Sequence, residues 1–208
     1  MTDVGLDIWI PDGFIELPLT DIDRNISVVA DVANDLPDPA IRDMAAGVLP
    51  MIAVLLHDLV QRDVRYCGVG RHLTTTGSLI TSCISVCLYE SGDEKLNPRL
   101  VLKDLVESRI SAGDDLGRIE LVDVDTRPVL FSERTCELPA PQFPGSPYQS
   151  ETAATYQLEA VVPAESGTAV AAIELSTAYV DDGVEFRRMV FDMARSVDFR
   201  TSTASLSW

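Results

Sequence analysis

The chain has few of the residues on which most catalytic sites depend. Only two histidines, His57 and His72, occur among its 208 residues. His57 falls on the polar side of a predicted helix, which indicates a surface position. His72 ends a predicted strand, where it could act as a base for Ser78 or Cys67, but nothing in the sequence orients it as a triad requires. The sequence therefore predicts no catalytic residue.

Basic residues are also scarce. Lys and Arg total 16 against 33 Asp and Glu, which gives a formal net charge of −17. A field of this sign repels phosphates, so the composition argues against a nucleic-acid backbone or an anionic membrane as partner. Acidity of this kind keeps a protein soluble, and it also suits a partner with a basic surface.

Signals for export and membrane insertion are missing. The first residues contain neither a basic segment nor an apolar one, so we expect a cytoplasmic protein. The longest apolar run, Ala45–Leu56, is interrupted by Gly47 and Pro50 and is too short for a bilayer. We therefore expect no membrane insertion.

The four cysteines do not form a recognisable metal site or disulfide pattern. Cys83 and Cys87 lie on one face of a predicted strand, roughly 13 Å apart, which is too far for a mutual disulfide. Their spacing on a strand also lacks the knuckle of a zinc site. We expect reduced, buried thiols and a reducing compartment. Whether Cys67 and Cys136 pair with neighbouring strands stays open.

Motifs for phosphate and metal binding are incomplete. The stretch 68–77 contains glycines, Arg71 and hydroxyls, but it has neither the Walker lysine nor a dinucleotide fingerprint. It is typical of a bulged strand followed by a turn. The acidic residues Asp114-Asp115, Asp123, Asp125 and Asp181-Asp182 lack the spacing of a calcium loop. We expect no metal and no cofactor.

The C-terminal third has the clearest secondary-structure pattern. Thr155–Val162 and Ala169–Thr177 alternate between apolar and polar residues, which predicts a half-buried hairpin. A helix should follow, with Asp182 as its cap and Glu185 completing a capping box. Its apolar positions recur every three or four residues and should face the core. They are Phe186, Met189, Val190, Met193 and Val197.

The N-terminal half predicts helices and strands in sequence. One helix should begin at Asp21 and a second at Asp38-Pro39, with Pro50 kinking or dividing the second. Both carry an apolar stripe. A third helix should begin at Asn97-Pro98. The predicted strands are Phe14–Leu17, Val64–Leu73, Leu79–Glu90, Arg118–Val124 and Pro128–Leu138.

Consecutive strands dominate this order of elements. We therefore predict one α+β domain over residues 1–199, with a mainly antiparallel sheet of about six to seven strands and helices packed on it. A proline-rich loop should span residues 138–151, and a polar tail residues 200–208.

The order of elements resembles the PsbP-like α/β/α sandwich, a fold of photosystem accessory proteins, a Ran-binding family and many actinobacterial proteins. The resemblance rests on the segment 11–18, the strands 156–162 and 170–177, and the closing block 186–199. The paired helices within 21–62 exceed the minimal fold. The resemblance implies a non-enzymatic protein that works by protein contact, and it transfers no catalytic residue.

These observations favour an interaction protein, such as an adaptor, a chaperone or an assembly component of a larger bacterial complex. Its partner would be either another protein, for example one with a basic surface, or a second copy of this chain. Its expected interface residues are apolar side chains outside the predicted core: Val184, Phe191, Trp208, Phe143 and Tyr148. The alternative is a small-molecule binder or hydrolase-like enzyme with a pocket lined by Cys67, His72, Cys136 and Tyr148.

Overall fold

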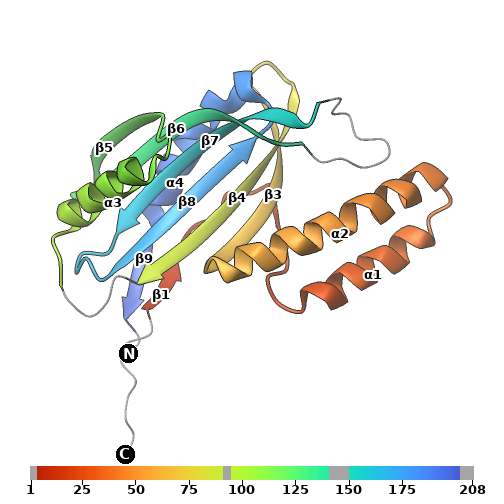
Figure 1. Ribbon diagram of the computed structural model, residues 1–208, viewed down its shortest axis with the longest axis horizontal. Coiled ribbons are helices and arrows are strands. Elements are labelled where there is room, and N and C mark those ends of the chain that lie inside the picture. The colour runs from red at the N-terminus through yellow and green to blue at the C-terminus, as the bar shows by residue number, and fades with distance from the viewer. Residues whose placement is uncertain (1–3, 91–94, 141–149, 202–208) are drawn as a thin grey trace, which may run out of the picture.

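A seven-stranded antiparallel sheet forms the centre of the protein (Figure 1). The computed structural model describes residues 4–90, 95–140 and 150–201. This sheet and its helices confirm the predicted single α+β domain. The strands of the sheet, in spatial order, are β2 (Phe14–Glu16), β3 (Val64–Leu73), β4 (Leu79–Glu90), β8 (Ala169–Thr177), β7 (Thr152–Pro163), β6 (Arg127–Pro139) and β5 (Arg118–Val124).

The helices lie on both faces of this sheet. α2 (Pro39–Gln61) and α3 (Pro98–Ala112) lie on the face toward the viewer in Figure 1, and α4 (Arg187–Ser196) lies on the face behind it. α1 (Ile22–Asn34) pairs with α2. β1 (Val4–Asp7) and β9 (Asp198–Thr201) form a separate two-stranded sheet, so the segment predicted as a tail begins inside β9.

The main core lies between α4 and the sheet. Alternate residues of the central strands point toward α4, and Ile84, Ile173 and Leu175 are fully buried there. Val190 and Met193 of α4 are also fully buried, while Phe186 and Val197 are nearly so. Met189, the remaining member of the predicted stripe, is only partly buried but packs against the same core. Each fully buried large side chain contributes about 1.5–3 kcal/mol by leaving water.

The start of the closing helix differs from the prediction. Residues Val180–Phe186 form a 3₁₀ helix, and α4 begins only at Arg187. Asp182 caps neither helix, and Glu185 does not form a capping box. The Glu185 carboxylate instead accepts hydrogen bonds from the backbone N–H and hydroxyl of Thr75, at 2.9 and 2.8 Å. It thus ties the closing helix to the β3–β4 turn.

α1 and α2 form a helical hairpin, which we call the arm, that extends sideways from the sheet (Figure 1). Asp38 caps α2 as predicted, since its carboxylate accepts from the N–H of Ala40 at 2.9 Å. Asp21 does not cap α1, because its backbone is left-handed and its side chain makes no capping bond. α2 runs through Pro50 as one helix, so the predicted division there is wrong.

Candidate functional site

The predicted pocket around Cys67 and His72 does not form. The register of β3 against β4 places Cys67 on the face toward α2 and α3, and His72 on the face toward α4. His72 Nε2 lies 3.0 Å from Ser82 Oγ, and its ring contacts Phe14 and Phe186. Burial lowers the pKa of His72, and Ser82 is buried. No carboxylate among the described residues orients this histidine, so the pair lacks the third member of a triad.

All four cysteines lie on the face of the sheet toward α2 and α3, and all are free thiols. The hydrogen bond between Cys67 and Cys83 raises the pKa of Cys67, which burial raises further, and lowers the pKa of Cys83. Cys136 Sγ donates to Gln157 Oε1 at 3.3 Å. Cys136 is therefore held in a polar network far across the sheet from Cys67. The two cysteines do not line one pocket, as the prediction required.

Charged and amide side chains cross this face of the sheet between α3 and the arm. Arg109 of α3 donates two hydrogen bonds to the Glu159 carboxylate, at 2.5 and 2.8 Å. Glu174, directly opposite Glu159 in the β7–β8 register, accepts a bond from Gln157 at 3.2 Å. These residues line a polar hollow of about 260 Å³. Of its two arginines, Arg109 is ion-paired with Glu159, while Arg134, among the described residues, bonds only to the neutral Gln157 amide oxygen and the Asp115 carbonyl.

Glu174 is the member of this network whose charged form is disfavoured by its surroundings. Solvent reaches its side chain, but the surrounding walls displace much of its water, which raises the pKa of the carboxyl. The negative charge of Glu159 raises that pKa further. A carboxyl with a raised folded-state pKa holds more protons in the folded than in the unfolded protein. Its contribution to stability is therefore present at low pH and declines as the pH rises from about 4.3 through the folded-state pKa.

We expect Glu174→Gln to stabilise the protein at pH 7 by up to about 1 kcal/mol, the range of an opposed like-charge pair near solvent. The difference should shrink as the pH falls toward 4, because a growing share of the carboxyl is then protonated in both the folded and the unfolded protein. Urea unfolding from pH 4 to 8 measures this difference. Glu165→Gln, at an exposed turn, is the control and should show no such trend. Parallel pH profiles for Glu174→Gln and the natural protein would contradict the assignment.

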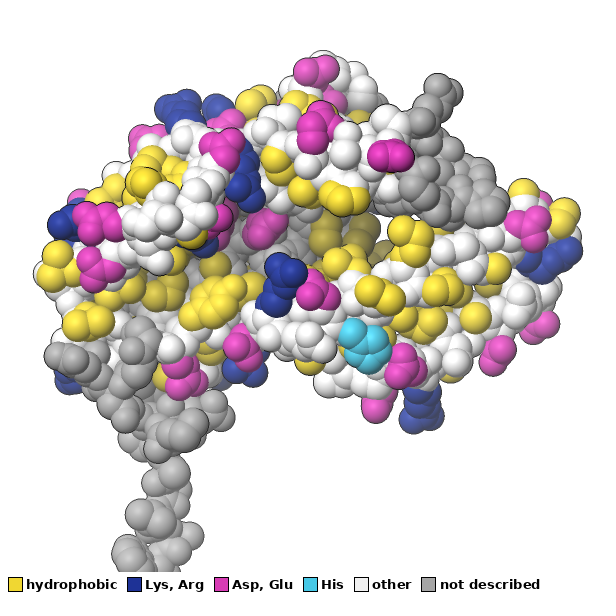
Figure 2. Space-filling model, viewed as in Figure 1, with side chains coloured by type: hydrophobic (Ala, Val, Ile, Leu, Met, Phe, Trp, Pro, Cys, Tyr) yellow, Lys and Arg dark blue, Asp and Glu magenta, His cyan; other side chains and the backbone are white. Residues whose placement is uncertain are grey.

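The arm exposes apolar side chains along both of its helices. Leu56 is fully buried, but Met44, Met51 and Leu55 lie along one side of α2 with 40–48% of their surface exposed. Val54 is 71% exposed. α1 adds Val28, Val29 and Val32, each at least half exposed. Figure 2 shows hydrophobic side chains spread along the arm on the viewer's side. The apolar periodicity was a correct signal for helices, but it could not tell whether a neighbour covers the stripe.

α2 also meets the length and composition of a membrane-crossing helix. Its 23 residues have a mean hydropathy of 1.6 over the most apolar window, of which 6% is buried. The prediction that this region is too short for a bilayer considered only the run 45–56 and its interruptions at Gly47 and Pro50. The helix continues through both residues and extends beyond the run at each end, from Pro39 to Gln61. Length and composition are the only support for a span.

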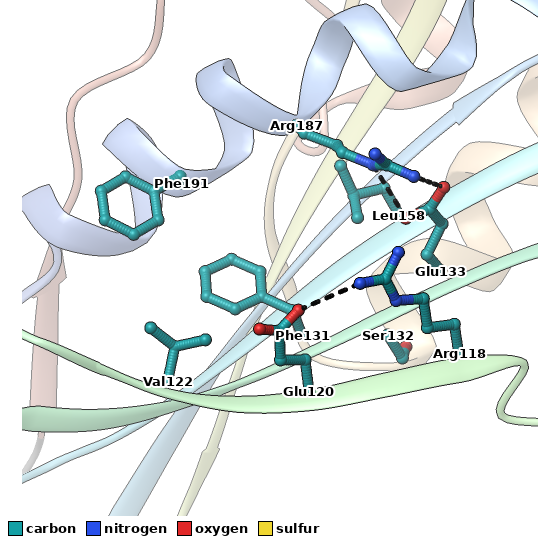
Figure 3. Close-up of a pocket in the computed structure, with 9 residues that line it drawn as sticks. All are labelled: Arg118, Glu120, Val122, Phe131, Ser132, Glu133, Leu158, Arg187 and Phe191. Atoms are coloured by element: carbon teal, nitrogen blue, oxygen red, sulfur yellow. Dashed lines mark hydrogen bonds and ion pairs between the residues drawn. The ribbon is translucent and has the colours of Figure 1, made fainter.

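A small groove separates α4 from strands β5 and β6 (Figure 3). Phe191 of α4 and Phe131 of β6 are near-parallel rings whose centroids lie 6.1 Å apart, and Val122 and Leu158 complete the apolar floor. Arg187 donates two bonds to Glu133 at the rim, which lowers the pKa of Glu133. The groove has a volume of about 200 Å³.

The predicted interface residues have different environments. Val184 is 48% exposed in the 3₁₀ helix and is free to contact a partner. Phe191 is half-buried and packs on Phe131, so part of its surface is already used inside the protein. Phe143, Tyr148 and Trp208 lie outside the described residues. Several side chains of the arm are as exposed or more so, but they were not among the predicted interface residues, because the sequence showed only apolar helical stripes there.

Comparisons with known proteins add little. No family model matches the chain, so the PsbP-like resemblance stays a prediction. No curated protein matches either. A crystal structure from Bacteroides thetaiotaomicron VPI-5482 is similar over 65% of this chain and 46% of its own, at 7% identity and a TM-score of 0.36. The chain thus spans less than half the length of that structure, and a likeness of this size carries no inference.

Proposed function

We propose that this chain is a non-enzymatic interaction protein, an adaptor or assembly component, that presents the arm to a partner protein. The observation that carries the proposal is the apolar outer surface of α1 and α2, which the rest of the described chain leaves uncovered. Exposed apolar patches of this kind are typical of protein-binding surfaces. The proposal gives the Ser82–His72 pair no catalytic role, since no carboxylate in the described part of the chain bonds to this histidine.

Charge favours a partner with a basic border around its apolar contact. Exposed carboxylates of Asp31, Asp35, Asp38 and Asp43 surround the tip of the arm, where Arg42 is already bonded to the Leu36 carbonyl. A second copy would bring two chains of formal charge −17 together and would meet the same carboxylates. A basic partner replaces that repulsion by attraction, which also speeds association.

The test places a photo-reactive amino acid at Met51 of the full chain in its native host. We expect a cross-link to one partner protein, identified by mass spectrometry and then purified. The same group at Leu73, 73% exposed at the end of β3, should give no such product. With the purified partner, Met51→Asp and Leu55→Asp should each weaken binding by about tenfold or more, since each places a charge in an apolar contact.

The same substitutions should leave folding intact, because exposed positions tolerate change within about 0.5 kcal/mol. Melting curves of Met51→Asp, Leu55→Asp and the control Leu73→Asp measure this. Cross-links only between copies of the chain, or only to lipid, would overturn the proposal. So would binding that is unaffected by both arm variants.

A further inference from the structure

Within the described residues, no strand pairs with the outer edge of β5. β5 pairs with β6 on one side and ends the strand order on the other. The opposite edge, β2, has only three residues. β5 has seven residues in an uninterrupted register from Arg118 opposite Glu133 to Val124 opposite Arg127. It contains neither a proline nor a bulge, two of the devices that protect an edge strand, but it does carry charge at Arg118, Glu120 and Asp123.

The turn that closes the β5–β6 hairpin shows which backbone groups face outward. Asp125 and Thr126 both have positive φ, as a two-residue type I′ turn requires. The flanking pair, Val124 and Arg127, is then hydrogen-bonded, and hydrogen-bonded pairs recur at every second residue. Ile119, Leu121 and Asp123 therefore direct their N–H and C=O groups away from β6. None of these groups takes part in a described backbone bond outside the strand ladders.

An apolar groove lies on each side of this edge. On the α4 side is the groove of Figure 3, where Val122 and Glu120 lie beside Phe131 and Phe191. On the α3 side a second groove, of about 380 Å³, has an apolar floor from α3, β5 and β6 and a charged border that includes Arg99, Lys103 and Glu107. Ile119 and Leu121 belong to it and are 42% and 47% exposed. An extended chain sends alternate side chains to opposite faces, so both grooves fit one added strand.

We propose that β5 binds an extended segment of a partner protein, which adds to the sheet as an eighth, antiparallel strand. The surface is separate from the arm, and this proposal stands or falls independently of the proposed function. Backbone bonds to Ile119, Leu121 and Asp123 would give affinity, and the two grooves would give specificity, as in other cases of strand addition.

The residues of β5 define the segment that fits. On the α3 face, apolar side chains suit Ile119 and Leu121. A basic side chain there would share the Asp123 carboxylate with Arg99 of α3, which already forms an ion pair with it. On the α4 face, an aromatic side chain opposite Val122 reaches toward Phe131 and Phe191. A basic side chain there would share Glu120 with Arg118, whose Nη2 lies 3.7 Å from that carboxylate. An antiparallel strand that meets all five requirements reads Lys-Phe-Val-Lys-Val from its N-terminus. Its positive charge also complements the acidic protein.

A second copy fits this edge poorly. Full antiparallel pairing of two β5 strands about a two-fold axis sets Leu121 against itself, but it sets Glu120 against Val122 and Ile119 against Asp123. A shift that pairs Ile119 with Leu121 sets Glu120 against Glu120. Like charges directly opposite each other destabilise a strand pair.

The test uses a fluorescent Lys-Phe-Val-Lys-Val peptide and the full chain, with anisotropy as the readout. We expect saturable binding and slower amide exchange at Ile119, Leu121 and Asp123. A peptide N-methylated at both valines loses two N–H donors toward β5, so its affinity should fall by about tenfold. Equal binding of the two peptides, exchange protection confined to other strands, or no saturable binding would each overturn the proposal.

Two variants connect the binding to the edge. Leu121→Pro removes an outward N–H and leaves the β5–β6 bonds in place, which an edge strand tolerates. It should fold and lose the peptide by about tenfold or more, whereas Leu121→Val should retain binding within about threefold. Sedimentation of the protein alone gives a further check. A dimer that Leu121→Pro converts to a monomer would show that a second copy occupies the edge, and the peptide would then be the wrong occupant.

Discussion

Met193→Asp is expected to unfold the protein. Met193 is fully buried between α4 and the sheet, among Val190, Ala194 and the inward residues of the central strands. Removing its side chain costs about 2–5 kcal/mol, and an unpaired buried charge adds several kcal/mol. The sum is comparable to the free energy of unfolding of most folded domains, which is about 5–15 kcal/mol. Circular dichroism, thermal melting and size-exclusion chromatography measure the loss.

Val184→Asp is the matched control for this experiment. It introduces the same charge in place of an apolar residue on the preceding 3₁₀ helix, where 48% of the side chain is exposed. We expect it to melt within about 0.5 kcal/mol of the natural protein. If Met193→Asp melted equally well, α4 would not be packed on the sheet as described.

Gly167→Ala is expected to give the second-largest loss of stability. Gly167 lies in the turn between β7 and β8 with φ +69°, where an L-residue costs about 1–2 kcal/mol. A Cβ there would also lie 2.3 Å from the Leu96 carbonyl oxygen, in the backbone segment that leads into α3. Displacing that segment adds about 1–3 kcal/mol, by analogy with overpacking a core. Urea unfolding should therefore show a loss of about 2–5 kcal/mol.

Gly77→Ala separates the two causes. Gly77 has φ +84°, but a Cβ there meets no atom within 4 Å. This variant should show the conformational cost alone, about 1–2 kcal/mol. The difference in unfolding free energy between the two variants then measures how tightly the β7–β8 turn packs against Leu96. The same contact includes a hydrogen bond of 2.9 Å from the Leu96 N–H to the Ser166 carbonyl. Equal losses would mean that the turn and the segment before α3 are not in contact.

The strands of the sheet were predictable from the sequence because the signal for each strand lies within its own segment of the chain. The predicted bounds of β3, β4, β5 and β8 are the ones observed, and alternation with a period of two indicated β8. The spatial order of the strands was not predicted, because β4 pairs with β8 and not with the next strand along the chain. Likewise, the bond between Glu185 and Thr75 joins residues 110 positions apart, and no local pattern announces it. Glu185 was therefore assigned to the nearest available role, a capping box.

The candidate surfaces were harder to predict for a different physical reason. The stripe of Met44, Met51 and Leu55 has the same period whether it faces a core or a partner, so periodicity cannot separate the two. The free edge of β5 depends on which strand ends the sheet, a property of the whole topology. Cys67 and His72 looked like neighbours, but their separation by an odd number of residues along one strand puts them on opposite faces.

The pairing of β1 with β9 determines how the protein responds to a pull on its two ends. Val4 and Thr201 are register partners, so both ends leave the two-stranded sheet at the same point. A force applied there runs along the hydrogen bonds of the β1–β9 ladder, which lie perpendicular to its strands. The ladder would therefore open one bond after another, at low force, before any load reaches the seven-stranded sheet.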